Sequence, residues 1–211
     1  DVFQGIVTGN NPAFLPTNEQ IKANKIEKEL LHPVLLGRDF EKWLIRSFER
    51  QILYLHGDVD IKKYPHTEQW LLQFRLALKK RRECQRGIIP WYSLQWPRVR
   101  SQLDIIPKII VQGTRNPRLE TRIVATIDKV GIYGTQGLNF IVPKTKNVSV
   151  YFLLGILNST LINYLFATKY LNVAIKAAYL KDIPIPMITK VDNNSISNIV
   201  LFETGPSIFI F

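Results

Sequence analysis

The stretch that most limits what this chain can fold into is the apolar run LLGILNSTLINYLF, residues 153–166. Polar residues interrupt it from Asn158 onward, long before the roughly 20 apolar residues that a membrane-spanning helix requires. Its larger apolar side chains recur at steps of three and four residues, the spacing of one helix face packed on a protein core. They are Leu153, Leu154, Leu157, Leu161, Tyr164 and Leu165. We therefore predict a buried helix over residues 149–167, with Asn158 as an internal hydrogen-bonding residue, and no membrane partner.

Short β-branched runs fill the centre of the chain. KIIVQ, RIVATI and GLNFIV are separated by Gly, Asn and Pro residues, a pattern typical of strands joined by turns. The prolines of DIPIPMI forbid a regular helix there. The sequence predicts an α+β fold, a mixed α/β domain with a β-rich centre.

The first third of the chain mixes helix and strand signals. VFQGIV and ERQILYLH have the composition of strands. Thr17 followed by Gln20 is a capping-box pattern, which predicts a short helix after it. A longer helix is expected from Thr67, with a basic end and an apolar side. That side comprises Trp70, Leu71, Phe74, Leu78 and a possible fifth member, Leu76.

The charge balance points to a polyanionic partner. Lys and Arg number 28 against 17 Asp and Glu, a net charge of +11, and such an excess concentrates polyanions near the surface. A basic protein without such a partner is the alternative. Cys84 is the only cysteine, so the chain can form neither a disulfide framework nor a thiolate cluster, and we expect a cytoplasmic location.

Sequence signatures of catalysis are few. The chain contains no phosphate-binding GxxxxGK[ST] loop, no GxGxxG and no GxSxG. Its three histidines are far apart and lack the spacing of a zinc site. Asp58, Asp60 and Lys62, with Asp39 upstream, have the acidic-x-Lys form of a magnesium-dependent nuclease site. The same residues also have the composition of a charged turn.

Two groups of side chains have the chemistry of DNA contacts. Arg matches the edge of guanine, and Asn or Gln the edge of adenine. The candidate base readers are Gln112, Arg115, Asn116, Arg118, Arg122, Gln136 and Asn139. Basic side chains that suit phosphates, which fix position without reading sequence, are Lys79, Lys80, Arg81, Arg82, Arg86, Arg98 and Arg100. The alternatives are solvated turn residues and a helix end favoured by the helix dipole.

Several segments, taken in order, resemble a known family. GIVTGNNPAFL, HPVLLGRDFEKW, WYSLQWPR, PKIIVQ, LLGILNSTLINYLF and YLKDIPIP are similar to the C-terminal target-recognition domain of TaqI-type adenine-specific DNA methyltransferases and related single-chain restriction-modification enzymes. DIPIP also resembles the ends of recognition domains in type I specificity subunits. The resemblance covers roughly residues 1 to 188. NVAIKAAYL departs from the family pattern, which has glycines and polar residues before the final IPIP.

The resemblance implies a specificity domain without chemistry of its own. Residues 1–190 would bind double-stranded DNA, and a methyltransferase domain upstream in the parent chain would extrude and methylate an adenine. S-adenosylmethionine and the catalytic Pro-Pro-aromatic motif would belong to that upstream domain, since this sequence has no Pro-Pro pair. Residues 191–211 are an unassigned tail. The alternatives are the small nuclease and an RNA-binding or protein-binding basic module.

Overall fold

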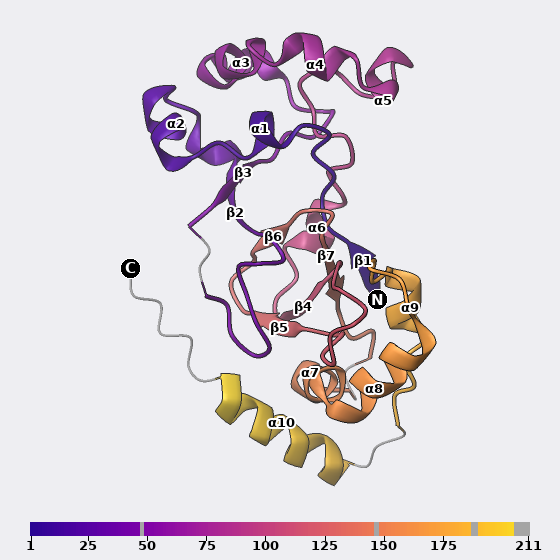
Figure 1. The fold of residues 1–211 in the computed structure, drawn as a ribbon. Helices are drawn as coiled ribbons and strands as arrows, with labels where there is room; N and C mark the ends of the chain where they lie inside the picture. Colours follow the sequence, from indigo (N-terminus) through magenta and orange to yellow (C-terminus); the bar gives the residue numbers. More distant parts are fainter. Residues whose placement is uncertain (47–48, 146–147, 187–189, 205–211) are drawn as a thin grey trace.

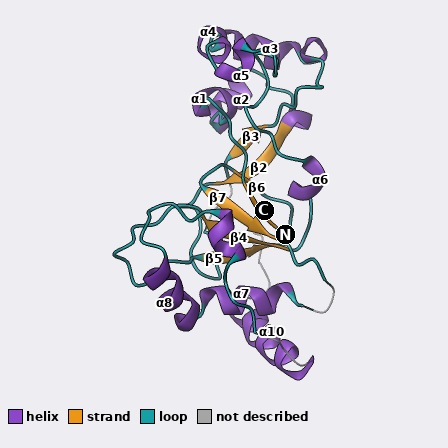
Figure 2. Ribbon diagram, turned by 90° about the vertical axis from the view of Figure 1, so that its right-hand side faces the viewer, coloured by secondary structure: helices purple, strands orange, loops and turns teal. Residues whose placement is uncertain are grey.

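The computed structural model describes residues 1–46, 49–145, 148–186 and 190–204. The molecule is elongated, with an upper lobe of short helices and a lower lobe built around a sheet (Figure 1). Seen after a quarter turn, helices lie at both ends and the strands lie between them (Figure 2). The predicted α+β class is confirmed.

The upper lobe consists of short helical elements. They are α1 (Asn11–Phe14), α2 (Asn18–Ala23), η1 (Lys28–Leu30), η2 (Ile61–Lys63), α3 (Pro65–Leu72), α4 (Arg75–Lys79) and α5 (Arg82–Gln85). A three-stranded sheet of order β3-β2-β6 leads from this lobe toward the lower one. Its strands are β2 (Leu31–Leu35), β3 (Gln51–Leu53) and β6 (Tyr133–Gly134). β2 pairs antiparallel with β3 and parallel with β6.

The lower lobe is built on an antiparallel sheet of order β1-β7-β4-β5. Its strands are β1 (Val2–Gln4), β4 (Lys108–Gln112), β5 (Ala125–Asp128) and β7 (Leu138–Ile141). The helices of this half are α6 (Arg100–Leu103), α7 (Val150–Asn158), α8 (Thr160–Lys169), α9 (Ala177–Lys181) and α10 (Lys190–Thr204). α7 packs on β4 and β5, α10 packs on α7, and α9 lies beside β1.

Strands β4, β5 and β7 are buried along their whole length, which explains why their sequences do not alternate between apolar and exposed polar residues. Successive side chains of a strand point to opposite faces. Ile110 therefore joins the core that extends into the upper lobe, whereas Ile109 and Val111 join the core beneath α7 and α8. The strands predicted at KIIVQ, RIVATI and GLNFIV are confirmed, although the second begins only at Ala125.

The predicted single helix over residues 149–167 is wrong in one respect: it is broken at Ser159. Ser159 has an extended backbone, ends α7 and caps α8 by accepting a hydrogen bond from Ile162 N (3.2 Å). A serine hydroxyl offers backbone donors an alternative to the helix ladder, which favours a break here. Because the helices bend by 61°, Leu161, Tyr164 and Leu165 lie exposed instead of on the predicted buried face.

Asn158 is buried and hydrogen-bonded, as predicted. Its side chain accepts from Ala125 N (3.0 Å) and donates to Ala125 O (2.9 Å), which fastens the end of α7 to β5. No single helix among the described residues is long and apolar enough to cross a membrane, and the bent pair α7 and α8 reaches that threshold only together.

Other predictions for the N-terminal half had mixed outcomes. The capping box of Thr17 and Gln20 is confirmed at the start of α2. Thr67 does not cap a helix, because it lies inside α3, where its backbone N–H donates to Glu27 Oε2 (2.8 Å). The long basic helix expected there is divided into α3, α4 and α5, and Leu76 is exposed.

The tail that the sequence left unassigned contributes α10 to the lower lobe. Residues 205–211 of that tail lie outside the described residues. Gly155 of α7 faces α10 so closely that a Cβ there would lie 3.0 Å from methyl carbons of Ile196 and Val200. A small residue at this position of α7 therefore permits α10 to pack on it.

Candidate nucleic-acid interface

The basic group at the end of α4 and the start of α5 lies in the upper lobe. Lys79, Lys80 and Arg82 are exposed, and among the described residues their side chains have no hydrogen-bond or ion-pair partner. Arg81, between them in sequence, is buried instead. Its guanidinium donates to the carbonyls of Leu78 (3.0 Å), Ser93 and Trp91 (both 2.8 Å). Lys79, Lys80 and Arg82 remain predicted phosphate contacts, whereas Arg81 is buried and bonds to the backbone of Leu78, Trp91 and Ser93.

Arg98 and Gln136, far apart in sequence, are both hydrogen-bonded to Gln4 of β1. Arg98 is half-buried, donates through Nε to Gly5 O (2.9 Å) and through Nη2 to Gln4 Oε1 (3.3 Å). Gln4 in turn donates to Gln136 O (2.9 Å). Burial lowers the pKa of Arg98. Arg98 is therefore bonded to the backbone of Gly5, just after β1, and to the side chain of Gln4, and the side chain of Gln136 is exposed.

Arg100 lies at the start of α6, where its charge is already paired. Its Nε is 3.4 Å from Asp104 Oδ2, and both side chains are largely exposed. Asp104 also accepts a hydrogen bond from Tyr133 Oη (2.7 Å). Burial, followed by that hydrogen bond, raises the pKa of Tyr133.

Three of the predicted base readers are buried, and this placement does not support DNA contacts by them. Arg122 is 0% exposed and Asn139 is 2% exposed. Gln112 is 9% exposed and donates to Gly37 O (2.6 Å). A side chain enclosed by the protein has no free edge to offer a base. These three side chains form hydrogen bonds within the protein instead.

The loop that follows β4 holds the other predicted readers. Arg115 is half-buried and donates through Nε to Thr121 O (2.5 Å) and through Nη1 to Gln112 Oε1 (3.1 Å). Asn116 accepts a hydrogen bond from Arg118 N (3.0 Å), which closes a tight turn. The side chains of Asn116 and Arg118 are exposed at that turn.

Lys42 is a candidate contact that the sequence analysis did not identify. Its ammonium donates to Asn158 O (2.9 Å), at the end of α7. It shares with Arg115 a hollow of about 340 Å³, whose other lining residues are Phe40, Glu41, Gln112, Thr121 and Val124. Burial, and then the charge of Arg115, lower the pKa of Lys42. Nothing in FEKW distinguishes this lysine from a solvated one, so only its folded position identifies it.

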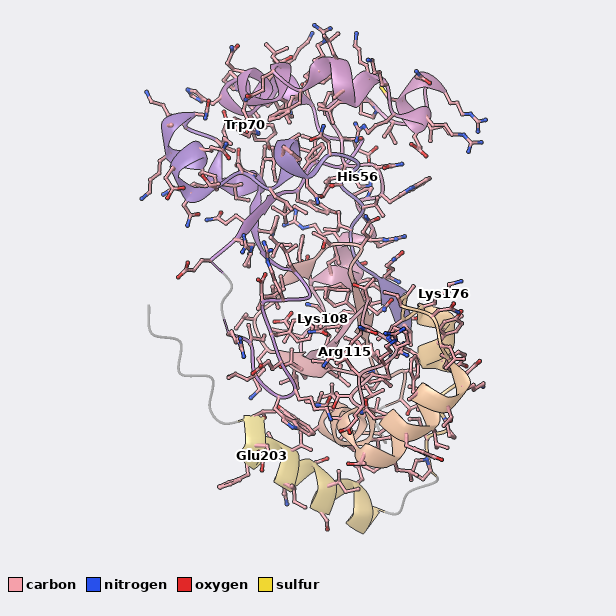
Figure 3. The ribbon with its side chains drawn as sticks, viewed as in Figure 1. His56, Trp70, Lys108, Arg115, Lys176 and Glu203 are labelled. Carbon is pink, nitrogen blue, oxygen red and sulfur yellow. The ribbon has the colours of Figure 1, made fainter. Side chains whose placement is uncertain are left out.

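A third segment, residues 170–176, lies against the loop that carries Arg115. Thr114 and Ala174 form an antiparallel bridge, flanked by hydrogen bonds from Arg115 N to Val173 O (2.9 Å) and from Ile175 N to Gly113 O (2.8 Å). We call residues 37–43, 113–122 and 170–176 together the three-loop surface. These ranges contain six Lys and Arg residues against three Asp and Glu, and five of the six basic residues are at least partly exposed, whereas Arg122 is buried. Arg115 and Lys176, which belong to it, both lie in the lower lobe (Figure 3).

The structure gives no support to the nuclease alternative. Asp60 caps η2 by accepting from Lys62 N (3.2 Å), and Asp58 pairs with His56 (3.0 Å). Asp39 lies in another loop, where it accepts from Leu36 N (2.8 Å). Across the described ranges, no three His, Cys, Asp or Glu side chains are grouped so that they could hold a metal ion.

The structure is thus a mixed α+β domain with basic residues on its loops. Residues 32–185 match the family described as the TaqI-like C-terminal specificity domain. The chain belongs to that family, and it is therefore a target-recognition domain of the kind found in TaqI-like restriction-modification enzymes. The predicted family is confirmed.

Solved structures share the fold. One is the type IIL restriction-modification enzyme MmeI in complex with DNA, with a TM-score of 0.54 and 14% identity over 77% of this chain. Another is the type IIG restriction endonuclease BpuSI, with a TM-score of 0.57 and 11% identity over 95% of this chain. This chain spans 21% of the first and 25% of the second. No curated protein matches it.

Proposed function

We propose that this chain binds duplex DNA sequence-specifically through the three-loop surface. The observation that carries the proposal is the hollow shared by Lys42 and Arg115, beside the exposed turn of Asn116 and Arg118. Family membership supports it, because a target-recognition domain of this family implies recognition of a DNA sequence. MmeI, which has the same fold, was crystallised with DNA.

Electrostatics makes the hollow suitable for a phosphate. Burial, and then the charge of Arg115, lower the pKa of Lys42 and the pKa of Arg122. These cations therefore repel one another, and a bound anion would relieve the repulsion. Glu41, the carboxylate among the described residues that line the hollow, pairs with Arg46. A DNA phosphate would fix the register of the duplex here, while Arg118 and Asn116 have the donors and acceptors that read base edges.

We further propose a division of labour within a longer protein. An upstream domain with S-adenosylmethionine would methylate adenine N6, and this chain would hold the duplex while the base is extruded. The small share of MmeI and BpuSI that this chain spans supports such an arrangement. This sequence has no Pro-Pro pair, so it lacks the Pro-Pro-aromatic motif of adenine methylation. The cytoplasm is the compartment in which such a domain would meet DNA.

Binding of the chain to a duplex across a salt series tests the proposal. Each phosphate that is neutralised contributes about 0.9 to the slope of log affinity against log salt. Lys42→Ala and Arg115→Ala should each weaken binding to all duplexes. Each should also reduce the slope by about 0.9, the contribution of one phosphate contact. Lys28→Ala, which removes an exposed lysine of η1, is the matched control and should leave the slope unchanged.

The results separate the alternatives. A wild-type chain whose affinity does not change with salt would overturn duplex binding as its function. Equal competition by single-stranded RNA would favour the RNA-binding alternative, because single strands are bound by stacking and charge without a groove. Equal loss in the Lys28→Ala control would show that net charge, and not the hollow, governs the affinity.

A further inference from the structure

The segment 170–176 combines a fixed backbone with exposed apolar side chains. Leu171 is 73% exposed and Val173 is 55% exposed, although both lie between residues that pack inward. On one side Tyr170 stacks on Tyr179 (ring centroids 4.2 Å apart, 15° between planes). On the other side Ile175 is 2% exposed. The two apolar side chains are thus held outward by ordered neighbours.

Buried polar residues hold the backbone of this segment. Arg122 donates to Tyr170 O (3.0 Å) and Asn172 O (2.7 Å). Asn139 donates to Ile175 O (2.7 Å). The bond from Arg115 N to Val173 O (2.9 Å) adds a third donor from the sheet side. Arg122 and Asn139, expected from sequence to contact DNA, instead fix the position of a neighbouring segment.

Exposed leucines are ordinary on protein surfaces, and Leu161 on α8 is 67% exposed. The 171–173 stretch differs from Leu161 in two ways. Its backbone is hydrogen-bonded to the loop that carries Arg115, and Lys176 follows it at the surface. Apolar side chains held rigidly beside cations suit a partner that has negative charges on its outside and apolar groups in its groove. Duplex DNA has this character, since thymine presents a methyl group in the major groove between the phosphates.

We infer that residues 171–173 form a second base-reading element, in which Leu171 and Val173 contact the apolar edges of bases. The inference deepens the proposed function and rests on it. Because the backbone is already ordered, little conformational entropy is lost when these side chains meet a groove. Asn172, whose amide makes only a long contact of 3.4 Å to Tyr179 Oη, lies between them and has the donor and acceptor pair that matches adenine.

Selection from a pool of randomised duplexes tests this element. The wild-type chain first defines its preferred sequence, and Val173→Thr and Leu171→Asn are then selected from the same pool. Both changes keep side-chain size and make it polar. We expect relaxed preference at one or two base pairs and an affinity for the wild-type site lower by roughly 5- to 150-fold, with an unchanged salt slope. Leu161→Asn is the matched control and should reproduce the wild-type preference.

The outcomes distinguish this inference from the proposed function. If the wild-type chain selects a sequence and both variants select the same one with unchanged affinity, residues 171–173 do not read bases, although duplex recognition stands. A uniform loss of affinity for all duplexes, with preference intact, would also overturn base reading. If the wild-type chain shows no salt-dependent duplex binding, the proposed function itself fails. Thermal unfolding of each variant confirms that it is folded before selection.

Discussion

Replacing Arg122 with methionine isolates the anchoring role of this buried guanidinium. Methionine keeps much of the apolar volume but removes the donors to Tyr170 O and Asn172 O, at 3.0 and 2.7 Å. The side chain is 0% exposed, so water does not replace the lost bonds without a rearrangement. The change should therefore lower the free energy of unfolding and loosen the segment 170–176.

The expected magnitude follows from the contacts. A hydrogen bond from a charged donor contributes about 1.5–3 kcal/mol, and the guanidinium lies 5.8 Å from the ring centroid of Phe166, which adds about 0.5–1 kcal/mol. Against this, Nε of Arg122 is buried and has no hydrogen-bond partner, a cost of about 1–3 kcal/mol that methionine removes. The net loss should be about 2–4 kcal/mol.

Urea unfolding measures the global loss, and hydrogen exchange measures the local one. The amides of Arg115 and Ile175, which bridge the two segments, should exchange faster in Arg122→Met. Arg118→Met, at an exposed turn, is the control and should change neither quantity by more than about 0.5 kcal/mol. A loss below about 0.5 kcal/mol in Arg122→Met, together with unchanged exchange, would refute the anchoring role.

Two further predictions concern buried ionisable groups. Lys108 and Asp128 form an ion pair of 2.5 Å with both side chains 0% exposed. Lys108→Met leaves the buried carboxylate unpaired, so it should lower the free energy of unfolding in urea by about 3–5 kcal/mol. A loss below about 1 kcal/mol would contradict this. Burial, and then the charge of Arg100, lower the pKa of His32 below its ordinary 6.5, with Asp104 opposing. The unfolded chain therefore binds more protons, and the stability contributed by His32 is full above pH 6.5 and is lost as pH falls through the folded pKa. His32→Phe should flatten thermal stability between about pH 7 and pH 5, and an unchanged profile would contradict it.

Local sequence patterns predicted the elements whose stability is decided locally. The capping box at Thr17 depends on residues three positions apart, and the strand KIIVQ on its own β-branched composition. The break at Ser159 was not predicted because the amino-acid sequence around it is also compatible with a continuous helix. Besides the local cap by Ser159, Asn158 and Asn163 bind the backbone of residues 122–125, and these long-range hydrogen bonds are not visible in the sequence pattern.

The candidate site was harder to predict because the type of a charged residue does not show whether its side chain points to the surface or into the protein. Arg115 and Arg122 look alike in sequence, yet one lines a surface hollow and the other is buried. A guanidinium can be satisfied by carbonyls far away in the chain, and Arg122 uses those of residues 170 and 172. Lys42 was missed for the converse reason, since only the packing of its loop on the end of α7 brings it beside Arg115.

The anchors of segment 170–176 act on its main chain alone. Arg122 and Asn139 donate to carbonyl oxygens, and every amino acid supplies a carbonyl oxygen. The side chains of residues 171–173 can therefore change while the hydrogen bonds to the backbone of the segment are kept. If these side chains read bases, as we infer, a changed target preference requires only their exchange and leaves the hydrogen bonds of Arg122 and Asn139 in place.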